Sequence, residues 1–283
     1  MATCAAEIRQ PHGFTLIEMI MVIVLLGILS TVLIVFIVTP FQAARDIERR
    51  ADLVDAADLA LNRISRELRG ALPNSVRVHG AGHVEFIETV TGGRYRRLPA
   101  PGGGSDQFVP ARGSDSFDVL GGLIDAGLVA SRAPGFDCGT PVGHCLSVFN
   151  TGQPGFNAYA GDNLAAITTA TPGSISYDRG ASGPAFATHS PQQRFFVTAN
   201  VVSYVCDPTS GQLRRHSGYG LSPVAPSLPA GGGELVVDQV TDCQFSYSAG
   251  TATRRGLVSL RLDLDDDGER VFLLVQAQVL NTP

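Results

Sequence analysis

The chain has 283 residues, enough for one sizeable domain or two small ones, and a formal net charge of −5. That negative balance gives no global basic field, so composition argues against nucleic acid as a partner. The 32 glycines and 17 prolines favour a loop-rich body over a helical bundle.

The first element is an apolar run from Met19 to Val38, interrupted only by Gly27, Ser30 and Thr31. A helix of about 20 residues spans ~30 Å, the thickness of a bilayer core. A secretory signal peptide is the alternative. Its apolar region, however, is only ~7–15 residues long, and no small-x-small cleavage site follows this run. We therefore predict a retained membrane helix.

One carboxylate, Glu18, stands at the head of the run. A charge at that depth in hydrocarbon costs a few kcal/mol. Taken alone, Glu18 could simply extend to the membrane interface.

The orientation of the membrane helix is a separate question. The positive charges that flank the apolar run would weakly place the part of the chain after the run in the cytoplasm. The cysteines of the body argue for the opposite, oxidising side.

The stretch GFTLIEMIMVIVLLGIL, which starts at Gly13, resembles the type IV prepilin N-terminal motif of pilins and of type II secretion pseudopilins. The resemblance implies cleavage after Gly13 by prepilin peptidase, N-methylation of Phe14 and a periplasmic body. Glu18 would then neutralise the Phe14 amine of a neighbouring subunit during assembly. Leaders of this family are often lysine-rich, whereas here only Arg9 is firmly basic.

The same resemblance implies a location and a set of partners. The protein would be a single-pass inner-membrane protein with a periplasmic domain, and it would later enter an extracellular pilus. Its partners would be prepilin peptidase, the inner membrane and other pilin subunits bound through the N-terminal helix. Cys4 would leave with the leader.

Beyond the apolar run, Pro40 should bend or loosen the helix. Apolar residues then recur at intervals of three and four and form one stripe of an amphipathic helix. Gly70 and Pro73 should end this helix, and strand patterns follow at once, which argues against a free coiled coil. The stripe consists of Ile47, Val54, Ala57, Leu61, Ile64 and Leu68.

The patterns NSVRVHG and GHVEFIETV predict a hairpin around Gly80–Gly82, with His79 and His83 as a solvated pair beside the turn. Further strand-like runs are SFDVLG, AITTA and SISYD. Between about Thr151 and Gln193 turn residues dominate, and we expect surface loops.

The C-terminal third predicts antiparallel strands. Val258, Leu260, Leu262 and Leu264 alternate with polar residues, and the closing run ERVFLLVQAQVL alternates in the same way. Each of these two strands should therefore have one face directed to a core.

A second resemblance rests on ELRGALPNSVRV, VSYVCD, GQLRRHSGYG, VTDCQFSYS and the closing GLVSLRLDLDDDGERVFLLVQAQVLNTP. These segments look like those of MshO-type minor pilins of the mannose-sensitive haemagglutinin (MSHA) pilus. The likeness covers the start to about Val78 and then Phe195 to Pro283. It implies a minor pilin; a J-type minor pseudopilin and a membrane-anchored adhesin or binding protein are the alternatives.

Four cysteines remain in the body once the leader is excluded, which suits two disulfides in an oxidising compartment. Four cysteines allow three connectivities. Proximity favours Cys138–Cys145, which leaves Cys206–Cys243. A zinc site is the weaker alternative, since Cys138 and Cys145 are spaced too widely for the usual zinc motifs.

The acidic run DLDDDGE offers a calcium interpretation, with Asp263, Asp265 and Asp267 at alternate positions of a D-x-D-x-D-G loop. The twelfth position of such a calcium loop, normally glutamate, is Leu274 here. The sequences on both sides of the acidic run are typical of strands rather than of helices. The alternative is an acidic hairpin turn at Asp267–Gly268. No other cofactor is expected, and the absence of nucleophile, zincin and phosphate-loop motifs argues against an enzyme.

The sequence therefore predicts an α+β, pilin-like fold. A long N-terminal helix, half transmembrane and half amphipathic, would pack on a β-rich antiparallel C-terminal domain. The expected segments are a leader at 1–13, an apolar assembly helix at 14–39, an amphipathic half-helix at 40–72 and a globular domain at 73–283.

Overall fold

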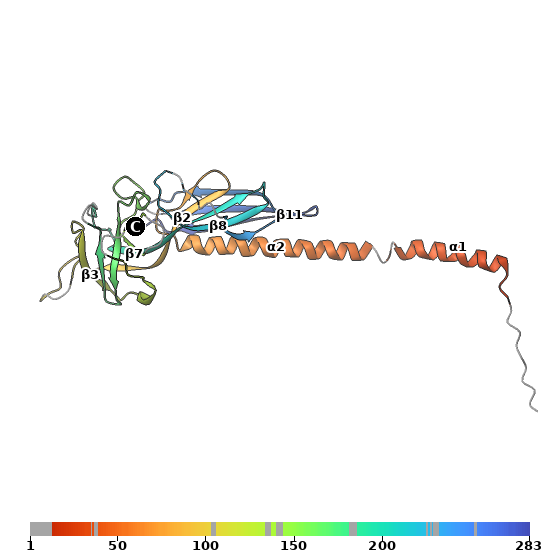
Figure 1. Ribbon diagram of the computed structural model, residues 1–283, viewed down its shortest axis with the longest axis horizontal. Helices are drawn as coiled ribbons and strands as arrows, with labels where there is room; N and C mark the ends of the chain where they lie inside the picture. Colours follow the sequence, from red (N-terminus) through yellow and green to blue (C-terminus); the bar gives the residue numbers. More distant parts are fainter. Residues whose placement is uncertain are drawn as a thin grey trace, which may run out of the picture. The chain divides into compact units, whose positions relative to one another are not determined.

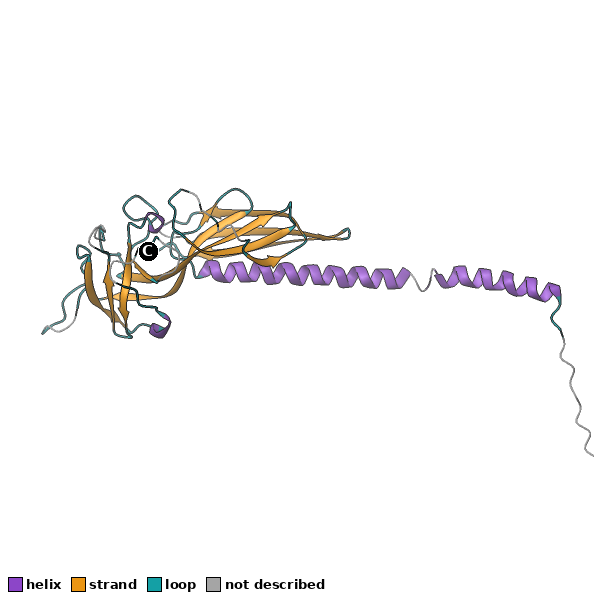
Figure 2. Ribbon diagram, viewed as in Figure 1, coloured by secondary structure: helices purple, strands orange, loops and turns teal. Residues whose placement is uncertain are grey.

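The computed structural model describes residues 13–34, 36, 39–102, 106–133, 137–139, 144–180, 186–224, 226, 228, 232–251 and 254–283. The chain divides into two units, Met1–Ala51 and Asp52–Pro283. The predicted leader other than Gly13, with Cys4 and Arg9, lies outside the described residues. Helices dominate the first unit and strands the second (Figure 2).

Two helices occupy the N-terminal region, where one continuous helix was expected. Helix α1 spans Leu16–Leu33, and α2 spans Thr39–Arg69. Pro40 is the second residue of α2. A proline is tolerated in a first helical turn because the amide hydrogen it lacks has no partner there anyway. Pro40 therefore lies at the start of α2. The expected bend or loosening of the helix near Pro40 stays a prediction, because residues 35, 37 and 38 lie outside the described residues.

The second unit contains the C-terminal part of α2, which buries a stripe of apolar side chains. Ile47 and Val54 were expected on that stripe, but both are exposed. The first buried apolar residue of α2 is Leu53, and the buried residues after it follow at intervals of three and four, as on one face of a helix. The buried residues are Leu53, Ala57, Ala60, Leu61, Ile64 and Leu68.

Two sheets supply the other walls of this core (Figure 1). One is a three-stranded antiparallel sheet, β10-β11-β12. The other is formed by β1, the first half of β2, the second half of β7, and β8 and β9. The bounds are β1 Arg77–Val78, β2 His83–Tyr95, β7 Arg194–Asp207, β8 Gln212–Tyr219, β9 Glu234–Val237, β10 Val240–Ser248, β11 Gly256–Asp266 and β12 Glu269–Val279.

The remaining halves of β2 and β7 continue into a second assembly (Figure 1). There the pairings run β2–β3–β6–β5–β4–β7 and return from β7 to β2, so the strands form a closed ring. Its interior is a separate core rich in aromatic rings, among them Tyr95, Phe108, Phe117, Tyr177 and Phe195. The added strands are β3 Ser114–Leu120, β4 Cys145–Ser147, β5 Leu164–Ala170 and β6 Ser174–Asp178.

Strand β2 changes from one assembly to the other through two irregularities in its register with β7, between Ile87 and Thr91. Such bulges bend a strand and increase its twist. Gly92 and Gly93 follow, where a Cβ on Gly92 would lie 2.9 Å from the Phe195 carbonyl oxygen. Glycine is therefore required where β2 passes closest to β7.

Within the segment from Thr151 to Gln193, the runs AITTA and SISYD form parts of β5 and β6, as their pattern predicted. Their side chains Ile167, Ile175 and Tyr177 enter the ring core, so the expectation of surface loops throughout this segment is wrong for these two strands. Two short 3₁₀ turns, η2 at Ala126–Leu128 and η3 at Ala158–Ala160, complete the regular elements. A third, smaller core containing Leu72, Ile87 and Tyr159 lies against the outer face of β2.

Candidate functional site

The first candidate site is the start of α1. Thr15 is the N-cap residue, and its Oγ1 accepts a hydrogen bond from the Glu18 backbone N–H at 3.4 Å. Glu18 is thus the third residue of the helix, where the T-x-x-E spacing is that of a capping box and a carboxylate suits the positive end of the helix dipole. This local role was not predicted from the sequence. It explains why α1 begins at Leu16, directly after Thr15.

Helix α1 carries its apolar side chains fully outward. None of its residues is buried, and Phe14 before it is 76% exposed. Within the part of the chain that the structure describes, α1 is the helix whose length and composition would let it cross a membrane. An apolar surface on every side of a helix requires lipid or a partner to cover it. The helix therefore fits a membrane-anchored protein.

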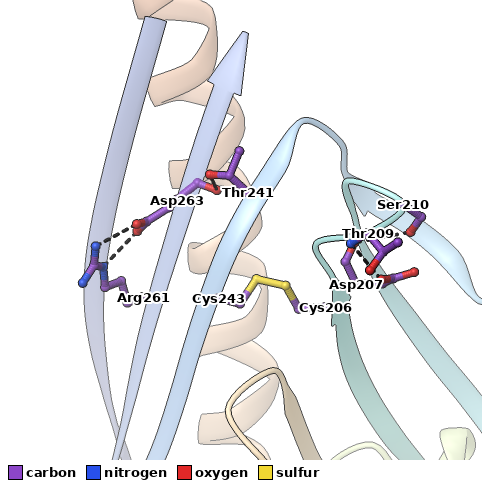
Figure 3. Close-up of a disulfide and its surroundings, with 8 residues drawn as sticks. All are labelled: Cys206, Asp207, Thr209, Ser210, Thr241, Cys243, Arg261 and Asp263. Carbon is purple, nitrogen blue, oxygen red and sulfur yellow. Dashed lines mark hydrogen bonds and ion pairs between the residues drawn. A yellow bond between two sulfur atoms is a disulfide. The ribbon is translucent and has the colours of Figure 1, made fainter. Parts of the chain in front are cut away.

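The four body cysteines form two disulfides, Cys138–Cys145 and Cys206–Cys243, as proximity favoured. Figure 3 shows the second bridge, which connects β7 of one sheet to β10 of the other. With their sulfur atoms in covalent bonds, these cysteines are not zinc ligands. The expectation from cysteine number and spacing is confirmed.

The acidic run forms the hairpin that joins β11 to β12. Asp267 and Gly268, with φ of 50° and 92°, make its two-residue turn, and Asp266 pairs with Glu269 across it. These positive φ values are typical of a type I′ turn. The hairpin alternative for this segment is therefore confirmed.

The proposed calcium ligands of this run point to arginines instead. Asp263 accepts two hydrogen bonds from Arg261, at 2.9 and 2.7 Å (Figure 3), and Asp265 accepts one from Arg270 at 2.6 Å. Across the residues that the structure describes, no three His, Cys, Asp or Glu side chains converge as a metal site would need. The geometry thus gives no support to calcium at Asp263, Asp265 and Asp267.

A buried polar cluster on the outer face of β2 was not expected from the sequence. Its centre is Glu85, whose side chain is 1% exposed. Oε2 of Glu85 accepts hydrogen bonds from Arg77 at 2.6 and 3.0 Å and lies 3.0 Å from Nε2 of His79. The Tyr219 hydroxyl donates to Oε1 at 3.0 Å. The carboxylate is therefore fully partnered, as a buried charge must be.

The arginine of this cluster also holds the neighbouring segments. The Arg77 guanidinium lies 3.4 Å from the centre of the Tyr159 ring and donates to the carbonyl oxygens of Ser222 and Pro223. The contact with the ring is a cation–π interaction. One side chain thus ties β1, the η3 turn and the segment after β8 together.

The histidines of the cluster are not the solvated pair that the sequence analysis expected. The side chain of His79 is 25% exposed, and Nε2 of His83 lies 2.8 Å from the Ser203 hydroxyl oxygen. Burial, with a smaller contribution from His79, lowers the pKa of His83 to about 4. His83 is therefore neutral at pH 7.

This shift predicts a pH dependence of stability. In the unfolded chain histidine has a pKa near 6.5, so between about pH 6.5 and 4 the unfolded state binds more protons than the folded state. We expect the free energy of unfolding to fall as pH drops through this window, and His83→Gln to reduce that fall. Urea unfolding at pH 7.5, 6, 5 and 4 measures it. Equal pH profiles for the wild type and the variant would contradict the assignment to His83.

Comparison with known proteins concerns the first candidate site. Residues 8–34 match the family model described as the prokaryotic N-terminal methylation motif. The match indicates a type IV pilin- or pseudopilin-type protein and implies processing by prepilin peptidase and assembly with other pilins. No curated protein and no solved structure matches the chain.

Proposed function

We propose that this protein is a minor pilin of an MSHA-like type IV pilus, with a structural rather than a catalytic role. The observation that carries the proposal is the order of groups at the N-terminus. Gly13 and Phe14, the residues between which we propose cleavage, precede an exposed apolar helix, and Glu18 stands in the first turn of that helix. Prepilin peptidase would cut after Gly13, and N-methylation would follow at Phe14.

The chemistry of assembly follows from charge in a low-dielectric environment. Cleavage would leave an ammonium group on Phe14, and Glu18 lies four residues further along the chain, in the first turn of α1. A lone carboxylate or ammonium in hydrocarbon costs several kcal/mol, and a close pair of opposite charges offsets much of that cost. Pairing between neighbouring subunits would therefore favour the filament over the isolated membrane form.

The location proposed is the inner membrane with a periplasmic body, followed by the filament or its initiating tip complex. Two disulfides in the body suit that oxidising side. The closed strand ring adds bulk beyond the sheets that cover α2, and a bulky body favours low copy number over the repeating shaft. A J-type minor pseudopilin of type II secretion and a membrane-anchored adhesin are the other candidates.

The test compares Glu18→Ala with Glu48→Ala. The second variant is the control, because it also removes an exposed carboxylate from a helix. We expect Glu18→Ala to be processed to begin at Phe14, yet to fall about tenfold or more in sheared pili while it accumulates in the membrane. Immunoblots of both fractions and intact mass measure this. Glu48→Ala should enter pili normally.

Two results would overturn the assignment. Normal entry of Glu18→Ala into pili would exclude an assembly role for the carboxylate. Absence of the wild-type protein from pili would favour the pseudopilin or the anchored adhesin. Deleting the type II secretin separates these two, because only a pseudopilin would depend on that system.

A further inference from the structure

A cavity with an excess of positive charge lies in the body, remote in sequence from the N-terminal helix. Its volume is 290 Å³, and its lining comes from the start of β7, the β10–β11 loop and the C-terminal residues. Three of the lining side chains are arginines, Arg194, Arg254 and Arg255, and none of the lining residues is acidic. The whole chain has a net charge of −5, so three arginines without a neighbouring acidic residue differ from its average composition.

A fourth arginine adds to this charge. Arg94 on β2 is the direct cross-strand partner of Arg194 on β7. Its Nε donates to the carbonyl oxygen of Gln192, which also lines the cavity. Like charges placed directly opposite each other on antiparallel strands destabilise a sheet. The pairing therefore places a further positive charge beside the cavity, and an anion bound there would reduce the repulsion expected between the two arginines.

Seven other described arginines of the body have carboxylate partners, whereas Arg179 and Arg214 donate to neutral oxygens. Arg63, Arg77, Arg96, Arg112, Arg215, Arg261 and Arg270 form salt bridges. Arg94 and Arg194 instead donate to neutral oxygens, those of Gln192 and of Thr282. The Pro283 main-chain oxygen nearby accepts from the Ser190 hydroxyl at 3.0 Å. Among the described carboxylates, none forms a salt bridge with the four arginines of this site.

The loop that carries Arg254 and Arg255 is held in place by Asn281. With its amide oriented to satisfy its neighbours, the Asn281 side-chain oxygen accepts from the backbone N–H groups of Gly250, at 2.6 Å, and Gly256, at 3.0 Å. A Cβ on either glycine would collide with that side chain. The two arginines are therefore presented from a fixed base.

We propose that this cavity binds a phosphate group carried by a small soluble ligand. Guanidinium groups match the oxygens of phosphate in a two-pronged geometry. A phosphate monoester carries a charge of about −1.5 to −2 at pH 7, which offsets more of the four positive charges than a single carboxylate does. The volume is near the lower limit of small-molecule sites, about 300 Å³, and suits a phosphate with a small substituent.

The test uses the full chain in a phosphate-free detergent, with inorganic phosphate as the probe and chloride at equal ionic strength as the reference. We expect saturable phosphate binding by calorimetry, weakened about tenfold or more in Arg254→Gln/Arg255→Gln. The matched control is Arg66→Gln/Arg69→Gln, which removes two exposed arginines of α2 and should bind as the wild type does. Glucuronate, a single carboxylate, should bind about tenfold more weakly than phosphate.

A second variant tests the repulsion itself. In chloride, Arg94→Gln should raise the melting temperature, because it removes one of two opposed charges, and it should reduce the stabilisation that phosphate gives. The proposal is overturned if phosphate binding is not saturable, if the control pair loses as much affinity as the loop pair, or if glucuronate binds as well as phosphate. A lower melting temperature of Arg94→Gln in chloride would also contradict it. None of these outcomes depends on whether the protein enters a pilus.

Discussion

Replacing Cys206 and Cys243 together by alanine should lower the free energy of unfolding by about 4 kcal/mol. The bridge closes a segment of 37 residues, so it removes much conformational freedom from the unfolded chain. It also connects β7 to β10, and so links the two sheets beside the apolar core that they share and the hydrogen bonds between them. The Phe245 N–H to Ala81 carbonyl hydrogen bond and that from Val240 N–H to the Gly211 carbonyl are among them.

The second disulfide provides the matched control. Cys138 and Cys145 are seven positions apart, for which the same relation gives about 2.5 kcal/mol. Urea unfolding of the two double-alanine variants, at equal pH and without reductant, measures both values. Equal destabilisation, or a larger effect of the Cys138–Cys145 pair, would show that the link between the sheets matters less than we argue. Alanine at both positions avoids a free thiol, which would confuse the comparison.

The parts of the fold that the sequence predicts are those with a strong local pattern. In the β11–β12 hairpin the alternation of Val258, Leu260, Leu262 and Leu264 places all four in the core, each at most 1% exposed. On β12 burial alternates as predicted: Val271 and Ala277 are buried, and Leu273 and Val275 pack against the same core. The run ERVFLLVQ has five apolar residues together, so two of them, Phe272 at 71% and Leu274 at 60% exposed, lie on the outward face.

The runs SFDVLG, AITTA and SISYD, which the sequence predicts as strands, belong to β3, β5 and β6. The closed ring itself could not be predicted, because its other strands lack a clear pattern. Strand β4 has three residues, and the end of β2 reads TGGRY, which is typical of a turn. Closure depends on β2 and β7 passing from one sheet to another, and that depends on bulges and on the close approach at Gly92. These are long-range features without a local sequence signal.

The polar cluster is a different case. Glu85 alternates with Val84 and Phe86, so the pattern places it on the face opposite the core of α2, where solvent is the ordinary neighbour. That face is instead covered by the η3 turn and the segment after β8, which follow much later in the chain. Burial of Glu85 is decided by elements that its own strand does not encode.

Replacing Glu85 by glutamine should lower the free energy of unfolding by about 3–5 kcal/mol. The substitution preserves shape and removes the charge, so Arg77 stays largely buried without its carboxylate. Removing one partner of a buried ion pair lowers stability more than removing both partners does, because a single remaining charge stays buried without an opposite charge. Arg77→Gln/Glu85→Gln should therefore be less destabilised than the sum of the two single variants, and urea unfolding of all four proteins measures the coupling.

Glu88→Gln is the control on the same strand. Burial raises the pKa of Glu88, so its charged form is already disfavoured and the neutral amide should cost little. Because Arg77 holds the carbonyl oxygens of Ser222 and Pro223, Glu85→Gln should also increase hydrogen exchange in residues 220–224, while Glu88→Gln should leave it unchanged. If Glu85→Gln loses stability without faster exchange there, Arg77 is held by Tyr159 alone. If Glu85→Gln is as stable as the wild type, the buried carboxylate does not hold the outer face of the sheet together.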